Sequence, residues 1–238
     1  MKMQIGAILA ASIVVFSTEA FAGQGNILRV LQTSPSGSVS GNSLSVDQSE
    51  ANESLLIGPS DATIQALSGK TLTIDHLERA TFDPGWSALQ NGEKNTAKVV
   101  IEGNGGQLQL LQDNMLPNNS EAVGSKGNSA VAELAAGALG GVFQLGDGNT
   151  AKLKVDPLGK GLIAQNGNGN FADLEVLGGG KGQIVQNGNR NNQPLTVTSN
   201  TTVMVTQNGN GLQPVGTAGI QVFSTNPGTI SITQTGFR

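Results

Sequence analysis

The sequence predicts an all-β fold: a β-solenoid of stacked strand-arc-strand repeats of about 21 residues, with an irregular N-terminal region. A Gln-x-Gly motif recurs at a constant interval, at Gln144, Gln165, Gln186 and Gln207. The flanking segments alternate apolar and polar residues, which is typical of strands with one buried face. The chain has 34 glycines and only 3% aromatic residues. Repeats this short bury their apolar faces only by stacking on their neighbours.

Residues 1–22 predict a secretory signal. Lys2 is followed by an apolar run over residues 5–16 and by Ala20-Phe21-Ala22, a small-x-small cleavage site. We expect cleavage after Ala22. The apolar run is too short to remain as a membrane span, so we expect an exported, soluble chain without stable membrane insertion.

Residues 23–85 are expected to form an irregular region that holds degenerate repeats or a targeting segment. Val30-Leu31-Gln32 and Gly41-Asn42-Ser43-Leu44 resemble one expanded copy of the repeat. Residues 62–67 and 71–74 alternate in polarity and are interpreted as a hairpin or a degenerate rung. The solenoid repeat domain is predicted for residues 86–238.

The shared repeat pattern is Gln-x-Gly-x-x-Asn-x-Ala, seen over residues 90–97, 144–151 and 165–172. Reversing the chain within a few residues requires a positive φ, which glycine tolerates best. The turn glycines that we expect in these arcs are Gly92, Gly146, Gly167, Gly188 and Gly209.

The glutamines are expected to point into the core, because the residue two positions earlier is always apolar. A buried amide is costly unless its donor and acceptor are both satisfied, and stacking on rungs about 4.8 Å apart satisfies them. The predicted ladder comprises Gln90, Gln112, Gln144, Gln165, Gln186 and Gln207. A second ladder is predicted at the turn from Asn95, Asn128, Asn149, Asn170 and Asn191.

Degenerate copies extend the array in both directions. A loop over residues 113–126 separates Gln112 from Asn128, and residues 230–236 supply a last single strand. Residues 132–139 are rich in alanine, but the repeat phase predicts strand and arc there. On the outer face, Lys152 should oppose Asp173, and Lys154 should lie between Glu133 and Glu175, which supports the register more than the stability.

Other functional classes have little support in the sequence. The absence of cysteine excludes disulfides and thiolate metal sites, and the net charge of -4 argues against nucleic-acid binding. His76 is the only histidine and has no nucleophile motif beside it, so we expect no enzyme, no catalytic or metal site and no cofactor. Asp147 suggests calcium, but aspartate occupies only one arc, unlike a calcium roll.

With this motif between short strands and behind a secretory signal, the chain resembles the curlin family of bacterial amyloid fibre subunits. The resemblance implies a two-strand rung, export through an outer-membrane secretion pore, a periplasmic chaperone, and polymerisation at the cell surface. The chain is a divergent member on this view. The family's second glutamine is replaced by aliphatic residues, and its alanine by Gln193 and Pro214 in later copies; the aliphatic replacements are Ile101, Leu134, Val155 and Val176.

The expected function is therefore a secreted structural subunit of curli-like cell-surface amyloid fibres, which supports adhesion and a biofilm matrix. Self or related subunits would add end to end, because the terminal strands of a solenoid are unpaired. The alternative is a monomeric secreted β-solenoid that serves as a surface adhesin or binding protein, with its N-terminal third as a cap.

Overall fold

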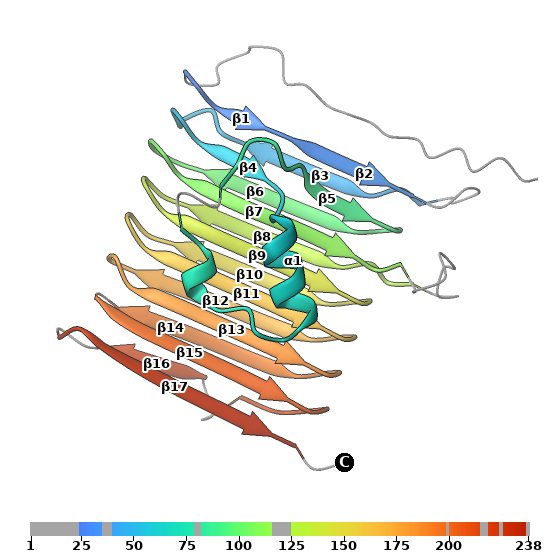
Figure 1. Cartoon of the computed structure of the whole chain (residues 1–238), viewed down its shortest axis with the longest axis vertical. Coiled ribbons are helices and arrows are strands. Elements are labelled where there is room, and N and C mark those ends of the chain that lie inside the picture. Colours follow the sequence, from blue (N-terminus) through green and yellow to red (C-terminus); the bar gives the residue numbers. More distant parts are fainter. Residues whose placement is uncertain are drawn as a thin grey trace, which may run out of the picture.

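The computed structural model describes residues 24–34, 40–78, 82–115, 125–198, 200–214, 219–223 and 226–236. The expected signal segment, residues 1–22, lies outside the described residues, and so does the middle of the expected 113–126 loop. The described chain is mostly β-structure, arranged as two parallel sheets of stacked strands (Figure 1). It is therefore all-β and solenoid-like, as the sequence predicts.

The chain alternates between the two sheets, so that each coil, or rung, contributes one strand line to each. The first sheet contains β1 (Ile27–Leu28), β2 (Val30–Thr33), β4 (Leu55–Ile57), β5 (Ala88–Asn91), β7 (Gln107–Asp113), β9 (Leu139–Leu145), β11 (Lys160–Asn166), β13 (Lys181–Asn187), β15 (Thr201–Asn208) and β17 (Gly228–Thr235). The second contains β3 (Ser43–Asp47), β6 (Thr96–Ile101), β8 (Ser129–Leu134), β10 (Thr150–Val155), β12 (Phe171–Leu177), β14 (Asn192–Thr198) and β16 (Ile220–Phe223). The alanine-rich segment forms the end of β8, an arc and the start of β9, which confirms the prediction of strand and arc.

The core between the sheets is aliphatic and arranged in layers. Val142, Ile163 and Ile184 occupy equivalent inward positions in the first sheet and are fully buried. The opposing leucines of the second sheet need space, which glycines in the first sheet supply. A Cβ on Gly161 would lie 2.6 Å from Leu153 Cδ1 and one on Gly182 would lie 2.7 Å from Leu174 Cδ1. Small and large residues therefore interlock across the core.

The two sheets also contain strands from residues 23–85, the region in which degenerate repeats are expected. Gln32 in β2 is paired in register with Gln90 in β5, and Ser43 in β3 with Thr96 in β6. The two segments that resemble an expanded repeat thus form a rung of the same two sheets. The sequence distance from this rung to the next is longer than the distance between later rungs, because the next strand line is interrupted.

That interruption is an insertion of residues 58–87 into one strand line. Ile57 lies opposite Gln109, and Leu89 lies opposite Leu111, so β4 and β5 are consecutive along β7. The backbone N–H of Gly58 donates to Trp86 O at 3.3 Å, which closes the neck of the insertion. The chain leaves the sheet after β4 and returns at the next position with no change of register.

The insertion forms helices, not the hairpin or degenerate rung expected from residues 62–67 and 71–74. Its helices are α1 (Asp61–Ser68) and the 3-10 helix η1 (Ile74–His76). Ser60 Oγ accepts a hydrogen bond from Thr63 N at 3.2 Å and caps α1. Thr63, Ala66 and Leu67 form its buried face with helical spacing. The short alternation in the sequence was thus overridden by capping and by packing on the sheet.

These helices cover the outer face of the first sheet, where Figure 1 shows them in front of the strands. Ile74 and Leu77 belong to a second buried cluster with sheet residues that point away from the main core, namely Leu111, Phe143, Leu162, Ala164 and Val185. Strands buried on both faces read as continuous apolar runs rather than alternations. The apolar run Leu162-Ile163-Ala164 therefore indicates, in the sequence, that both faces of this strand are buried.

Deleting residues 58–87 should leave a folded solenoid, because Ile57 and Ala88 already occupy neighbouring positions on β7. We expect a retained β-sheet circular dichroism spectrum and increased binding of a hydrophobic dye such as ANS, since the outer cluster becomes exposed. Ile64→Ser, a change at an exposed position of α1, is the control and should leave dye binding unchanged. A spectrum typical of an unfolded chain would contradict the assignment of an insertion.

Candidate functional site

The predicted glutamines lie on one line inside the core. Gln90, Gln112, Gln144, Gln165, Gln186 and Gln207 are each 0% exposed. Each Nε2 donates to the Oε1 of the next glutamine, at 2.7 Å from Gln90 to Gln112 and 2.9 Å from Gln144 to Gln165. The remaining steps measure 2.8 or 2.9 Å. We call this line the glutamine column.

The second Nε2 hydrogen of each glutamine forms a hydrogen bond to a backbone carbonyl of the other sheet. Gln144 donates to Ser129 O at 3.0 Å, and Gln165 donates to Thr150 O at the same distance. Gln186 donates to Phe171 O at 2.9 Å. Both donors and the acceptor of each amide are therefore used, which offsets the cost of burying it. The column fixes the register between rungs and also joins the two sheets.

The column extends beyond the predicted glutamines at both ends. Gln32 Nε2 donates to Gln90 Oε1, and Gln207 Nε2 donates to Gln234 Oε1 at 2.7 Å. It thus runs from the first rung, in β2, to the last strand, β17. Both glutamines lie in segments that resemble the repeat, and that resemblance was the available signal.

A second column of buried asparagines stands at the tight arc. Asn149 Oδ1 accepts from the backbone N–H of Asn170 at 3.0 Å, and its Nδ2 donates to Gly167 O at 2.7 Å. The same acceptor contact joins Asn95 to Asn128, Asn128 to Asn149, and Asn170 to Asn191. Asn42 begins this column, because its Oδ1 accepts from Asn95 N at 3.1 Å. Each asparagine therefore ties its own arc to the next.

The five turn glycines have φ between 100° and 141°: Gly92, Gly146, Gly167, Gly188 and Gly209. They also permit close approach of the arcs. A Cβ on Gly167 would lie 2.1 Å from Gly188 O, and one on Gly188 would lie 2.0 Å from Gly209 O. Glycine is needed here for conformation and for space at once.

The outward charges pair between neighbouring strands, as the register predicted. Lys154 Nζ lies 2.9 Å from Glu175 Oε1, and Lys152 Nζ lies 3.9 Å from Asp173 Oδ2. Glu133 is in register with Lys154 on the other side. All four paired side chains are more than a third exposed, so they contribute little to stability.

The two ends of the stack are open edges within the described residues. At one end, β17 pairs only with β15, and β16 pairs only with β14. At the other end, β1, β2 and β3 each have one partner strand, which lies deeper in the stack. Ile230, an inward residue of β17, is 39% exposed, whereas the equivalent Val203 one rung inside is 0% exposed. The last layer of the core is therefore incompletely covered.

The described residues contain no group of three or more histidine, cysteine, aspartate or glutamate side chains placed to hold a metal ion. His76 Nδ1 lies 3.2 Å from the Thr73 backbone N–H at the start of η1, where it contributes to a capping box. None of the described helices is long and apolar enough to cross a membrane.

Comparison of the chain with family models, curated proteins and solved structures finds no match.

Replacing Gln165 by leucine should destabilise the protein by about 2 to 4 kcal/mol, because it leaves the Nε2 of Gln144 and the Oε1 of Gln186 without their partners in the core. Chemical denaturation followed by circular dichroism measures this. Lys154→Ala removes an exposed ion pair and should cost less than about 1 kcal/mol. Equal losses for the two variants would count against the glutamine column as the main constraint.

Gly167→Ala should destabilise the protein by at least about 2 kcal/mol, because the added Cβ combines an unfavourable φ with a clash against Gly188 O. The exposed Gly178 also has a positive φ, of 56°, but a Cβ there would meet nothing within 4 Å. Gly178→Ala therefore shows the cost of a positive φ without a clash. A Gly167→Ala variant as stable as Gly178→Ala would show that the arcs are not packed closely.

Proposed function

We propose that this chain is a secreted structural subunit of curli-like cell-surface fibres, which stack head to tail through their terminal rungs. One observation carries the proposal: all hydrogen bonds of the glutamine column run in one direction, so that, among the described residues, the column has a free acceptor at one end and a free donor at the other. Because every Nε2 donates toward the C-terminal end, the first rung presents an acceptor, Gln32 Oε1, and the last strand presents a donor, Gln234 Nε2.

Neither group has a column partner in the part of the chain that the structure describes. Gln234 Nε2 donates to Gln213 O at 3.2 Å, which leaves its second hydrogen available. Gln32 donates to Gln90, and its Oε1 is open. A donor at one end and an acceptor at the other complement each other, so a second copy continues the column when it docks head to tail.

The backbone and the core support the same arrangement. The edges of β17 and β2 carry unpaired backbone groups, which pair with an incoming parallel strand. Placing Gln32 of one copy beside Gln234 of another puts Val30 on Ile232 and Leu28 on Ile230, apolar on apolar. The contact is heterologous, and such contacts generate open filaments where the rotation does not close.

The resemblance to the curlin family supports the cellular part of the proposal. On that basis the chain is exported through the periplasm with a chaperone and an outer-membrane pore, and its fibres support adhesion and a biofilm matrix. The proposed repeat length also agrees with the register, in which Gln144, Gln165, Gln186 and Gln207 are successive partners.

The test uses a variant that blocks one end. Gly236 N–H donates to Asn208 O of β15 at 2.9 Å, and because N–H groups alternate sides along a strand, the N–H of Thr233 points toward the free edge. Thr233→Pro removes that donor and obstructs docking, while proline is compatible with an edge strand. Thr233→Val keeps the N–H and is the matched control.

The wild-type protein and Thr233→Val should form fibres whose diffraction shows one spacing of about 4.7 Å and another of about 10 Å. Thr233→Pro should remain monomeric with an unchanged circular dichroism spectrum. Added in small amounts to the wild type, it should slow growth, because its intact N-terminal rung docks on a growing end and stops it. A wild-type protein that stays monomeric at tens of micromolar for days would favour the monomeric surface adhesin instead.

A further inference from the structure

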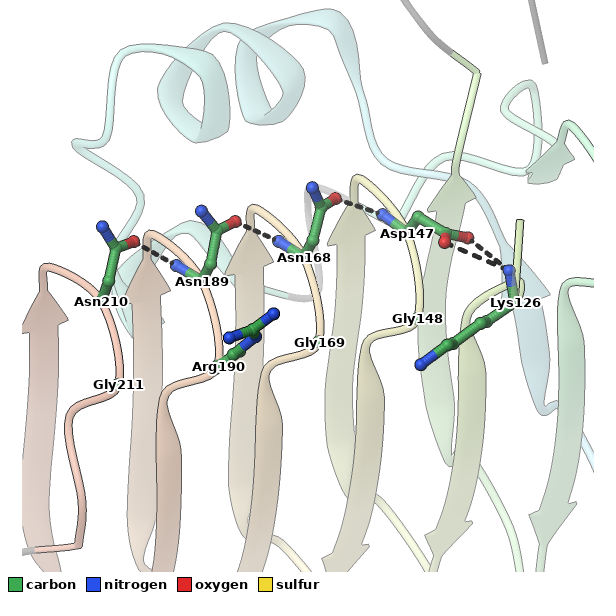
Figure 2. A pocket seen from close by; sticks show the side chains of 9 residues that line it. All are labelled: Lys126, Asp147, Gly148, Asn168, Gly169, Asn189, Arg190, Asn210 and Gly211. Carbon is green, nitrogen blue, oxygen red and sulfur yellow. Dashed lines mark hydrogen bonds between the residues drawn. The ribbon is translucent and has the colours of Figure 1, made fainter. Parts of the chain in front are cut away.

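A shallow groove of about 620 Å³ runs along the outside of the tight arcs, across several rungs. Figure 2 shows its lining, in which Lys126, Asp147, Asn168, Asn189 and Asn210 occupy the same position in successive arcs. Arg190 comes from the neighbouring position, where the other lining arcs have Gly148, Gly169 and Gly211. The groove belongs to neither buried column nor to the terminal rungs.

The side-chain oxygens of the exposed asparagines accept hydrogen bonds from neighbouring arcs, whereas their side-chain N–H groups donate to no described residue. Asn168 Oδ1 accepts from Asp147 N, Asn189 Oδ1 from Asn168 N, and Asn210 Oδ1 from Asn189 N, all at 2.8 Å. Figure 2 shows their Nδ2 groups at the crest of the arcs, pointing away from the Arg190 and Lys126 side chains. The rim of the groove that Asn168, Asn189 and Asn210 form therefore carries a row of N–H donors at the rung spacing of about 4.8 Å.

The one carboxylate in the lining is already satisfied. Asp147 accepts from Ser125 Oγ at 2.8 Å, from Gly127 N at 2.9 Å and from Lys126 N at 3.1 Å. Burial raises the pKa of Asp147, but these hydrogen bonds outweigh it and hold the pKa below its usual value. The carboxylate is thus ionised and engaged by the protein.

Two cations stand at the groove without a carboxylate partner in the described part of the chain. Lys152 and Lys154 on the second sheet form ion pairs, whereas Lys126 and Arg190 form none. Lys70 flanks an adjoining hollow that shares Asn210. The lining therefore carries two cations against one carboxylate, on a protein whose net charge is -4.

Arg190 occupies its position at a conformational cost. Its φ is 58°, close to the 66° of Gly148 and Gly169 and the 67° of Gly211. A left-handed conformation is unfavourable for a residue with a Cβ by about 1 kcal/mol or more. Lys94 holds the same position of an earlier arc with a φ of 56°, and its Nζ donates to Ser125 O at 3.0 Å, whereas the Arg190 guanidinium forms no ion pair with any described residue.

We propose that this groove binds an extended acidic polysaccharide, with Arg190 and Lys126 contacting sugar carboxylates and the three asparagine amides donating to ring and hydroxyl oxygens. A surface of donors and cations requires a ligand rich in oxygen acceptors and negative charge. The row of amides spans several rungs, so it fits a polymer that follows the axis of the stack rather than a compact anion.

A nucleic acid fits the groove less well. Single strands bind to aromatic side chains on which bases stack, and the lining contains no aromatic residue. Two or three cations also fall short of the many phosphate contacts that support tight binding. The polysaccharide is therefore the ligand class that the lining favours.

The decisive variant is Arg190→Gly, which removes the guanidinium and installs the residue that the neighbouring arcs use. We expect it to be at least as stable as the wild type but to bind alginate, a polymer of uronates, about tenfold or more weakly. Binding is measured on freshly purified monomer at low salt, so the outcome does not depend on fibre assembly. Lys181→Gln removes a charge outside the groove and should leave binding unchanged.

A second variant tests the amides. Asn168→Asp, Asn189→Asp and Asn210→Asp combined keep the oxygen that accepts each backbone N–H, as Asp147 does, but replace the donors by charge. Alginate binding should be lost. Three results would overturn the proposal: wild-type protein that does not bind alginate, equal binding by wild type and Arg190→Gly, or tighter binding of single-stranded DNA than of alginate.

Discussion

The buried side-chain amides of the glutamine column are the constraint on which the rest of the structure depends. A strand can slip along its neighbour by two residues and keep its apolar face inward. Such a slip would leave amide donors and acceptors unpaired on both sides, at a cost of about 1 to 3 kcal/mol for each group. The column therefore fixes one register, and the asparagine column, the turn glycines and the outward ion pairs all follow from it.

The direction of the hydrogen bonds in the glutamine column connects the fold to the proposed function. Amides that satisfy each other one after another leave a donor at one end and an acceptor at the other, as a helix leaves unpaired groups at its termini. The side surfaces of the stack differ from its ends. The insertion of residues 58–87 covers the outer apolar face of the first sheet, and the exposed arcs present donors and cations. We infer a molecule that grows along its axis and contacts other partners from its arcs.

The sequence was sufficient for the columns but not for the insertion or the groove. Gln165 and Asn170 recur at a fixed interval, and only stacking satisfies buried amides at that interval, so their roles follow from spacing. The helix α1 did not follow, because residues 62–67 also alternate in polarity and their phase was decided by the cap at Ser60 and by contact with the sheet. Asn168 and Asn189 were recognisable only as turn residues, since the use of their oxygens depends on the neighbouring arc.

Hydrogen exchange of the glutamine side-chain amides, followed by NMR on the soluble monomer, tests the central claim most directly. The account predicts that the Nε2 hydrogens of Gln144, Gln165 and Gln186 exchange only with global unfolding, whereas those of the exposed Gln65 and Gln221 exchange freely. Exchange of Gln144, Gln165 and Gln186 at the rates of the exposed glutamines would contradict it.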